Sequence, residues 1–303
     1  MVLICCPHPP GAQPSQYLVP FMTPQPTTAD LQQRLLADLT VLARPRHARW
    51  DELGLMAVRS FLKEELSALG ALEEHHFQSG SDAGVNLILK LPGRNPQLKP
   101  LLIGAHYDGP LQSIGADDNA SGVSALLELA RRWSKEPPNR PIWLVAFDQE
   151  EWGMLGSAAL AADLKASRQK LKLMVSLEML AYTAEQQDYP LEAMRRIFGE
   201  RGDFIALIAN TGSSLLLPSL AKAMGAHVKT KVLPVPNGGK ALPDVRLSDH
   251  SPFWDQGYNA LMVSDTSFMR NPNYHQMSDT IDTLDLAFFA SVVEGLDQAF
   301  KGI

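Results

Sequence analysis

The chain has 303 residues, of which 45% are hydrophobic and 20% are charged, and its formal net charge at pH 7 is −6. These proportions are typical of a globular protein, and the chain is long enough to bury a sizeable core. No basic patch stands out, so the composition does not support nucleic-acid binding. The only cysteines, Cys5 and Cys6, are adjacent; they make no disulfide framework, and stability must come from the core.

The sequence contains no candidate membrane anchor. No apolar run approaches the roughly 18 residues that a membrane-spanning helix needs. The first residues, Met1 to Cys6, are apolar but lack a basic segment and are soon followed by prolines, which makes a poor signal peptide. We therefore expect a cytoplasmic protein, with a secreted or periplasmic location left open because a start-site error could hide a signal.

The first 70 residues divide into an arm and two helices. Residues 1–28 are rich in proline and are predicted to form an irregular N-terminal arm, whereas residues 29–303 are predicted to form a single catalytic domain. Apolar residues recur at helical spacing from Leu31 to Leu42, which predicts a first helix. A second helix is predicted from about residue 50 to 69, ending at Gly70. Its inward side chains are predicted to be Leu53, Met56, Val58, Phe61, Leu62 and Leu66.

Strands then alternate with helices to the end of the chain. We predict strands at residues 75–78, 85–91, 101–106, 142–147, 173–177, 204–209 and 260–264, and helices at residues 121–133, 156–163, 213–224 and 284–300. Residues 183–200 are polar and predicted to be irregular, and residues 234–248 are predicted to form a loop that borders the cleft. This alternation predicts an α/β fold whose mixed, mostly parallel central sheet carries helices on both faces, as a three-layer sandwich.

Five short motifs carry histidine or carboxylate side chains, and three of them directly follow an apolar run that is typical of a buried parallel strand. The motifs are His106-Tyr107-Asp108, Gly115-Ala116-Asp117-Asp118-Asn119, Asp148-Gln149-Glu150-Glu151, Ser176-Leu177-Glu178-Met179 and Tyr274-His275. In open α/β sheets, ligands bind beyond the carboxyl ends of the strands, so these side chains are expected to converge on one cleft. Histidine nitrogen and carboxylate oxygen are zinc ligands, and two histidines with three carboxylates suffice for two ions.

In this order, the motifs resemble those of the co-catalytic dizinc aminopeptidases, a family that also includes glutamate carboxypeptidases and glutaminyl cyclases. The resemblance covers about residues 50–300. Its further markers are Ser248-Asp249-His250 and Ser278-Asp279-Thr280. The resemblance implies a zinc-exopeptidase fold of the phosphorylase/hydrolase-like type and two zinc ions per chain, although cobalt or manganese would also suit such ligands.

The resemblance also implies the ligand of each zinc. Asp117 would bridge the two ions, one of which would be completed by His106 and Glu178, and the other by Glu151 and His275. Glu178 departs from the family pattern, since the best-known aminopeptidases have aspartate at this position. The side chain is one methylene longer, which puts the position and strength of that zinc site in question.

Further roles follow from the same resemblance. Glu150 would be the general base that takes a proton from the zinc-activated water and passes it to the departing amine. Asp108 would orient the imidazole of His106, and Tyr274 would stabilise the oxyanion or simply pack. Asp249 would hold the α-ammonium group of the substrate or cap the helix that begins near Ser251. A cis peptide bond is expected after the bridging aspartate, between Asp117 and Asp118.

The leading hypothesis is a zinc exopeptidase that removes the N-terminal residue of a peptide with a free N-terminus. A glutaminyl cyclase with a single zinc is the first alternative, in which Glu150 and Asp249 would form a carboxylate network. A glutamate-releasing carboxypeptidase would need an arginine-rich pocket, for which Arg246 and Arg270 are weak candidates. A non-catalytic binding domain on the same fold is disfavoured, because every expected ligand type is present.

Overall fold

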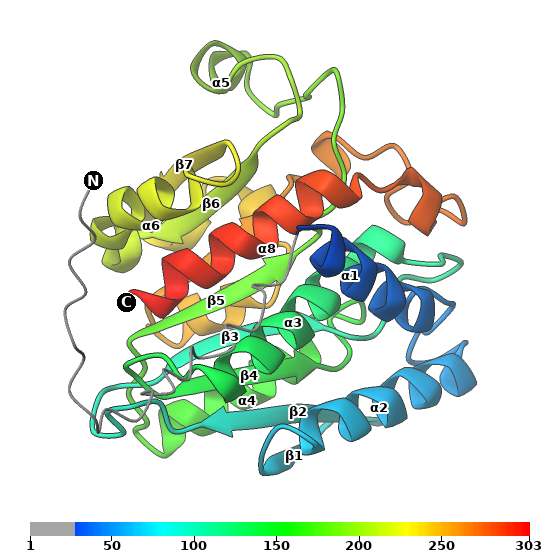
Figure 1. The fold of residues 1–303 in the computed structure, drawn as a ribbon, viewed down its shortest axis with the longest axis vertical. Coiled ribbons are helices and arrows are strands. Elements are labelled where there is room, and N and C mark those ends of the chain that lie inside the picture. The colour runs from blue at the N-terminus through cyan, green and yellow to red at the C-terminus, as the bar shows by residue number, and fades with distance from the viewer. Residues whose placement is uncertain (1–27) are drawn as a thin grey trace, which may run out of the picture.

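The computed structural model describes residues 28–303, which form one eight-stranded sheet covered by helices (Figure 1). The predicted N-terminal arm lies outside the described residues, apart from Thr28, where the first helix begins. The strands are β1 (Leu72–Ser79), β2 (Asp82–Leu91), β3 (Leu101–His106), β4 (Ile142–Phe147), β5 (Leu173–Glu178), β6 (Ile205–Asn210), β7 (Thr230–Val235) and β8 (Ala260–Ser264). The α-helices are α1 (Thr28–Leu42), α2 (Glu52–Ser67), α3 (Gly122–Lys135), α4 (Leu155–Ala166), α5 (Glu192–Phe198), α6 (Leu217–Met224), α7 (His250–Asp255) and α8 (Leu286–Lys301).

The sheet is mixed, with its parallel strands at the centre. The strand order is β1-β2-β4-β3-β5-β8-β6-β7. Strands β4, β3, β5 and β8 are parallel to one another, whereas β1, β2 and β4 pair antiparallel. Strands β6 and β7 are parallel to each other but antiparallel to β8. The predicted α/β fold with a mixed, mostly parallel sheet is confirmed, and the carboxyl ends of four central strands meet at one edge.

Helices cover both faces of the sheet. Helices α1, α2, α3, α6 and α8 contribute to the core on one face, whereas α4 and α7 pack on the other (Figure 1). Because both faces are covered, every residue of β3 and β5 is buried, which explains their nearly continuous apolar sequences. Among the described residues, no helix combines the length and apolarity needed to cross a bilayer.

Three details of the predicted elements were wrong. In α2, Leu53 and Met56 are 85% and 51% exposed, because Leu55 and Val58 set the face that packs on the sheet. Strand β7 was not predicted, because Pro234 interrupts its apolar run; as an edge strand, β7 tolerates a residue without an N–H group. The predicted irregular segment 183–200 contains the short helix α5, none of whose residues is buried and which stands away from the body in Figure 1.

Candidate metal centre and substrate pocket

The predicted motifs meet at the carboxyl edge of the parallel strands. His106 is the last residue of β3 and Glu178 the last residue of β5. Glu150 and Glu151 lie in the turn that follows β4, and His275 lies in the loop between β8 and α8. Asp118 lies in a short, irregular π-helical turn, Ala116–Ser121, that precedes α3 and whose backbone is not helical at Asp118 and Asn119. The sheet therefore directly positions one imidazole, that of His106, and one carboxylate, that of Glu178.

The carboxylate of Asp118 lies between the two histidines. Its Oδ1 atom is 3.4 Å from Nε2 of His106, and its Oδ2 atom is 3.3 Å from Nε2 of His275. Nε2 of His106 is also 3.5 Å from Oε2 of Glu178. Nε2 of His275 is 3.4 Å from Oε2 of Glu151. Asp118 therefore belongs to two groups of three side chains. One group also contains His106 and Glu178, and the other contains His275 and Glu151.

These separations fit a pair of zinc ions. Zinc–ligand bonds of about 2.1 Å in tetrahedral geometry place neighbouring ligand atoms about 3.4 Å apart. The observed separations of 3.3 to 3.5 Å lie close to this value. The donor set of two imidazole nitrogens and three carboxylates is also one that zinc accepts. His106 and Asp118 are buried, whereas the side chain of His275 is 42% exposed, so the site on the His275 side faces solvent.

The structure places Asp118, and not the predicted Asp117, between the two histidines. Asp117 turns away from the histidines: its Oδ1 accepts a bond from Ala181 N at 3.0 Å, and its Oδ2 accepts one from Asn271 Nδ2 at 3.0 Å. The non-prolyl cis peptide bond lies between Asp118 and Asn119, one residue after the predicted position. Burial and the neighbouring carboxyl of Asp265 raise the pKa of Asp117 well above its usual value. Asp117 is thus a buried structural side chain.

The turn that carries Asp118 is held from the loop before α8 and from β5. The two carboxylate oxygens of Asp279 accept the backbone N–H groups of Asp117 and Asp118 at 2.9 and 3.1 Å. Asn119 donates to Leu177 O at 2.8 Å and accepts from Met179 N at 3.1 Å. The sequence indicated Asp279 and Asn119 only as members of motifs. Their hydrogen bonds give each of them a structural role in this turn.

Asp108 lies beside the imidazole of His106, as predicted for an orienting carboxylate, but among the described residues Nδ1 of His106 has no hydrogen bond of good geometry. Its Oδ1 is 3.4 Å from Nδ1 of His106, and its two oxygens accept the backbone N–H groups of Glu150 and Glu151 at 3.1 Å each. The second contact was not predicted. One carboxylate therefore connects the end of β3 to the turn that presents both glutamates.

The longer side chain of Glu178 is fixed by serines. Ser248 donates to Oε2 of Glu178 at 2.8 Å, and its hydroxyl lies 2.7 Å from that of Ser176. With the extra methylene, the carboxylate of Glu178 still lies 3.5 Å from Nε2 of His106. Neither serine contact could be predicted from the spacing of the motifs.

The titratable groups of the centre strongly influence one another. Burial alone would raise the pKa of Asp118, but its contacts with His106 and His275 outweigh burial and lower it. Burial would lower the pKa of His106, but the carboxylates of Glu178 and Glu150 raise it well above its usual value. For Glu150, burial raises the pKa well above the usual value, opposed by His106 and reinforced by Glu178. In the metal-free centre, Glu150 therefore holds a proton more tightly than an exposed glutamate does.

Asp249 does not occupy the predicted substrate-binding position. Its carboxylate is fully buried, and neither oxygen accepts a hydrogen bond of good geometry from the described residues. It precedes α7 but its side chain makes no capping bond. Burial raises its pKa to about 7, only partly opposed by His106 and Ser157. A group without access to the cleft cannot contact the α-ammonium group of a substrate, and neither predicted role fits it.

Backbone strain accumulates beside the candidate ligands. Gln149, Met179 and His275 all have positive φ angles, of 59°, 46° and 59°. Such conformations cost a non-glycine residue about 1–3 kcal/mol and persist where the surrounding structure imposes them. The strain directly adjoins Glu150 and Glu178 and includes His275 itself, so the fold maintains this arrangement at the expense of local stability.

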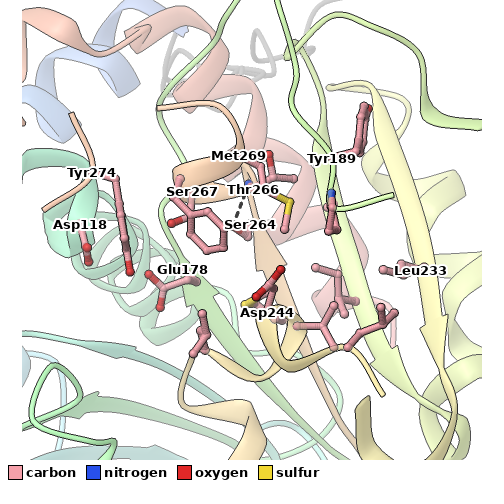
Figure 2. A pocket seen from close by; sticks show the side chains of 18 of the residues that line it. Asp118, Glu178, Tyr189, Leu233, Asp244, Ser264, Thr266, Ser267, Met269 and Tyr274 are labelled. Carbon is pink, nitrogen blue, oxygen red and sulfur yellow. Dashed lines mark hydrogen bonds between the residues drawn. The ribbon is translucent and has the colours of Figure 1, made fainter. Parts of the chain in front are cut away.

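A largely apolar pocket of about 280 Å³ opens from the metal centre (Figure 2). Part of its wall is the sheet, where Glu178, Ser264, Ala206 and Lys231 are successive cross-strand neighbours from β5 to β7. Ser264 and Ala206 are small and leave space beside Glu178. Residues of the segment around α5, such as Tyr189 and Phe198, and of the predicted loop 234–248 also line the pocket. That loop was predicted to border the cleft.

Tyr274 lies at the mouth of this pocket. Its ring stacks on that of His275 with a centroid distance of 3.8 Å, and Figure 2 shows it beside Asp118 and Glu178. Burial, followed by the charge of Asp118, raises the pKa of its hydroxyl, which therefore stays protonated at neutral pH. A protonated phenol next to the metal centre can donate a hydrogen bond.

The metal-free protein is expected to lose stability as pH rises from 5 to 8. Burial raises the pKa values of Asp249 and Asp279 to about 7 in the folded chain, whereas those in the unfolded chain are about 4. The folded state therefore binds protons more tightly, and its stability falls as pH rises through about 7. The midpoint of thermal unfolding, measured in chelator, should drop by at least about 2 °C over this range.

The same measurement with zinc is the control. Protons and zinc compete for the same ligands, so the zinc-loaded protein should instead lose stability and metal below about pH 5. A metal-free protein whose midpoint rises between pH 5 and 8 would contradict the raised pKa values.

Comparison with known proteins agrees with this geometry. The sequence pattern of the family described as Peptidase family M28 matches residues 86–298. The chain is 36% identical over 212 residues to YfbL of Escherichia coli K12, itself described as uncharacterized. The aligned region covers 65% of this chain and 64% of YfbL, so the chain spans less than two thirds of the length of this relative.

Two solved structures share the fold but differ in their described activities. The LapA aminopeptidase of Legionella pneumophila has a TM-score of 0.67 and 20% identity, with 90% of this chain and 71% of LapA covered. A glutaminyl cyclase of Bacteroides thetaiotaomicron, bound to N-acetylhistamine, has a TM-score of 0.67 and 16% identity, with 92% and 99% covered. Because the TM-scores are equal, the fold alone does not separate the two activities.

Proposed function

Because the chain belongs to peptidase family M28, we propose that it is a zinc aminopeptidase, which hydrolyses the N-terminal peptide bond of peptides with two zinc ions bound. One observation carries this proposal: the carboxylate of Asp118 presents one oxygen to His106 and the other to His275. A bridging carboxylate with a complete set of ligands on each side is what a pair of ions requires. The family is zinc-dependent; the number of ions is part of our proposal.

The residues divide between the two ions and the reaction. His106 and Glu178 would hold one zinc with Asp118, and His275 and Glu151 would hold the other. When bound, the zinc ions would act as Lewis acids that polarise the scissile carbonyl and lower the pKa of the attacking water.

Glu150, which lines the pocket beside the metal centre, is the general base of this proposal. It accepts the proton of the attacking water and transfers it to the nitrogen of the departing amine. Asp108 accepts a hydrogen bond from the backbone N–H group of Glu150, which fixes the backbone from which this side chain extends. Tyr274 donates its hydroxyl hydrogen to the oxygen on which negative charge develops.

The pocket defines the class of N-terminal residue. Its largely apolar walls, among them Met262 and Ile208, suit an apolar side chain. We therefore propose peptides that begin with a medium-sized or large apolar residue as substrates.

A glutaminyl cyclase is the second candidate. The negative charge of the buried Asp249 raises the pKa of Glu150, so the two carboxyl groups interact. A network of this kind is expected of glutaminyl cyclases and favours this candidate. The complete ligand set around His275 favours the aminopeptidase. A glutamate-releasing carboxypeptidase has less support: among the described residues no arginine lines the pocket, and Arg246 and Arg270 are bonded elsewhere.

Three substrate classes distinguish these functions. The zinc-free protein is titrated with zinc and assayed on aminoacyl p-nitroanilides, on a peptide with N-terminal glutamine, and on an N-acylated peptide with C-terminal glutamate. The proposal predicts release of apolar N-terminal residues that reaches its maximum at two equivalents of zinc. Cyclisation of the glutaminyl peptide without any aminopeptidase activity would replace it with the second candidate.

Replacing Tyr274 with phenylalanine is expected to lower kcat by about 100-fold, the loss typical of one oxyanion donor. KM and zinc content should stay within about twofold of the original protein, because the ring still stacks on His275. Steady-state kinetics and elemental analysis measure both. An unchanged kcat would assign Tyr274 to packing alone.

A further inference from the structure

A single buried arginine contacts both segments that present the candidate ligands. Arg46, in the connection between α1 and α2, is 1% exposed. Its guanidinium group has five N–H groups, and it makes five hydrogen bonds, all to backbone carbonyls. The acceptors are Tyr107 O at 3.1 Å, Arg44 O at 3.1 Å, Ile114 O at 2.9 Å, Gly115 O at 2.9 Å and Asp118 O at 3.1 Å.

Three of the carbonyls that accept hydrogen bonds from Arg46 belong to residues that are, or lie close in sequence to, the candidate zinc ligands. Tyr107 separates His106 from the orienting carboxylate of Asp108, and Asp118 is the candidate bridging residue itself. Gly115 begins the turn that leads to Asp118. We infer that Arg46 is a positioning residue of the metal centre, which holds the His106–Asp108 segment and the Asp118 turn at the separation that zinc binding requires. This inference rests on the metal centre of the proposed function.

The local packing is built around this guanidinium group. A Cβ atom at Gly109 would lie 3.0 Å from Cγ of Arg46, and one at Gly115 would lie 2.9 Å from Nη1. Gly115 also has a φ of +63°, which favours glycine. In return, the backbone N–H of Gly109 donates to Arg46 O at 3.3 Å. Both ligand-bearing segments therefore leave room for Arg46 where they approach each other.

Within residues 28–303, the charge of Arg46 has no carboxylate partner at ion-pair distance. The surrounding carbonyls and the more distant carboxylates therefore compensate the buried charge. Burial lowers the pKa of Arg46, opposed by the carboxylates of Asp118 and Asp108. A cation close to a zinc centre repels the metal, so a purely electrostatic role would weaken zinc binding. A positioning role strengthens it.

Replacement by lysine separates these two roles. Lysine keeps the charge, but its single ammonium nitrogen cannot reproduce the planar fork that joins Tyr107 O to Gly115 O. Arg46→Lys should therefore weaken zinc binding by about 10- to 100-fold, as is typical of residues that orient metal ligands. Zinc affinity is measured by competition with a chelator of known affinity, which needs no substrate.

Arg131→Lys is the matched control. Arg131 also makes several charge-assisted bonds, to Asp38 and Glu65, but it lies on α3 and contacts no candidate ligand. Both variants should lower the midpoint of thermal unfolding in chelator, whereas only Arg46→Lys should lose zinc affinity. Cobalt-loaded protein gives a second readout, since a displaced ligand changes the visible absorption spectrum of the cobalt centre.

The outcomes are distinct. Zinc affinity of folded Arg46→Lys within twofold of the original protein overturns the inference. If Arg46→Lys does not fold, Gly109→Ala tests the same contact, because its methyl group presses on an intact Arg46. A loss of at least threefold in zinc affinity is expected for it, and an unchanged affinity overturns the inference. The proposed aminopeptidase activity could fail in its own assay without affecting this result.

Discussion

Replacing Glu150 with glutamine is expected to lower kcat by about 1,000-fold while both zinc ions stay bound. General acid–base catalysis by a positioned side chain contributes about 100- to 10,000-fold, and glutamine retains the size of glutamate but accepts no proton. Zinc binding should persist because Glu150 is not among the side chains that face the two histidines. Steady-state kinetics on a leucyl substrate and elemental analysis of the same sample measure the two quantities.

The neighbouring residue provides the control. Glu151→Gln changes the same side chain one position later, but Glu151 lies 3.4 Å from His275. It should lose zinc, and activity should recover in part when excess zinc is added. Near-normal turnover by Glu150→Gln would falsify the assignment of Glu150 as general base, whereas loss of zinc from it would make Glu150 a ligand.

Replacing Asp118 with asparagine is expected to abolish zinc binding at both sites, with affinity reduced by more than about 100-fold. The substitution removes the negative charge and leaves one oxygen where two are needed, one facing His106 and one facing His275. Activity should fall to background at stoichiometric zinc. Isothermal titration with zinc measures both binding events in one experiment.

Asp117→Asn is the matched control for this prediction. Asp117 is the adjacent aspartate, equally buried, but its oxygens accept bonds from Ala181 and Asn271. The variant should still bind two zinc ions, although it should be less stable because one acceptor of a buried network changes. If Asp117→Asn loses zinc and Asp118→Asn retains it, the bridging residue is the one that the sequence alone indicated.

Most of the site was predictable because its signals are local. Apolar runs located the ends of β3, β4 and β5, and therefore placed His106, Glu150 and Glu178 at one edge of the sheet. Parallel strands that are buried on both faces are easy to recognise in a sequence, because they are nearly continuous apolar runs. The order of the motifs then sufficed to predict the family and the mixed sheet.

The choice between Asp117 and Asp118 was not local. The two aspartates are adjacent, and only the shape of the π-helical turn decides which one faces the histidines. That shape depends on Asp279 and Arg46, which are about 160 and 70 residues away along the chain. A spacing rule carries no information about such distant contacts, so the sequence located the pair of aspartates but not the one that faces the histidines.

Burial explains the other differences. Asp249 belongs to a motif that resembles those of the family, but its access to the cleft depends on how α7 packs, and that packing leaves it fully buried. In α2, the apolar residues permitted two helical faces, and contact with the sheet selected the one that contains Leu55. Both outcomes are tertiary effects without a short-range sequence signal.

The proposed activity requires a pair of zinc ions that share Asp118. A crystal structure of the zinc-loaded protein, with anomalous data collected at the zinc edge, tests this directly. It should contain two peaks, one between His106 and Glu178 and one between His275 and Glu151, each about 2.1 Å from one oxygen of Asp118. A single peak at excess zinc, or ions bound through Asp117, would contradict the account.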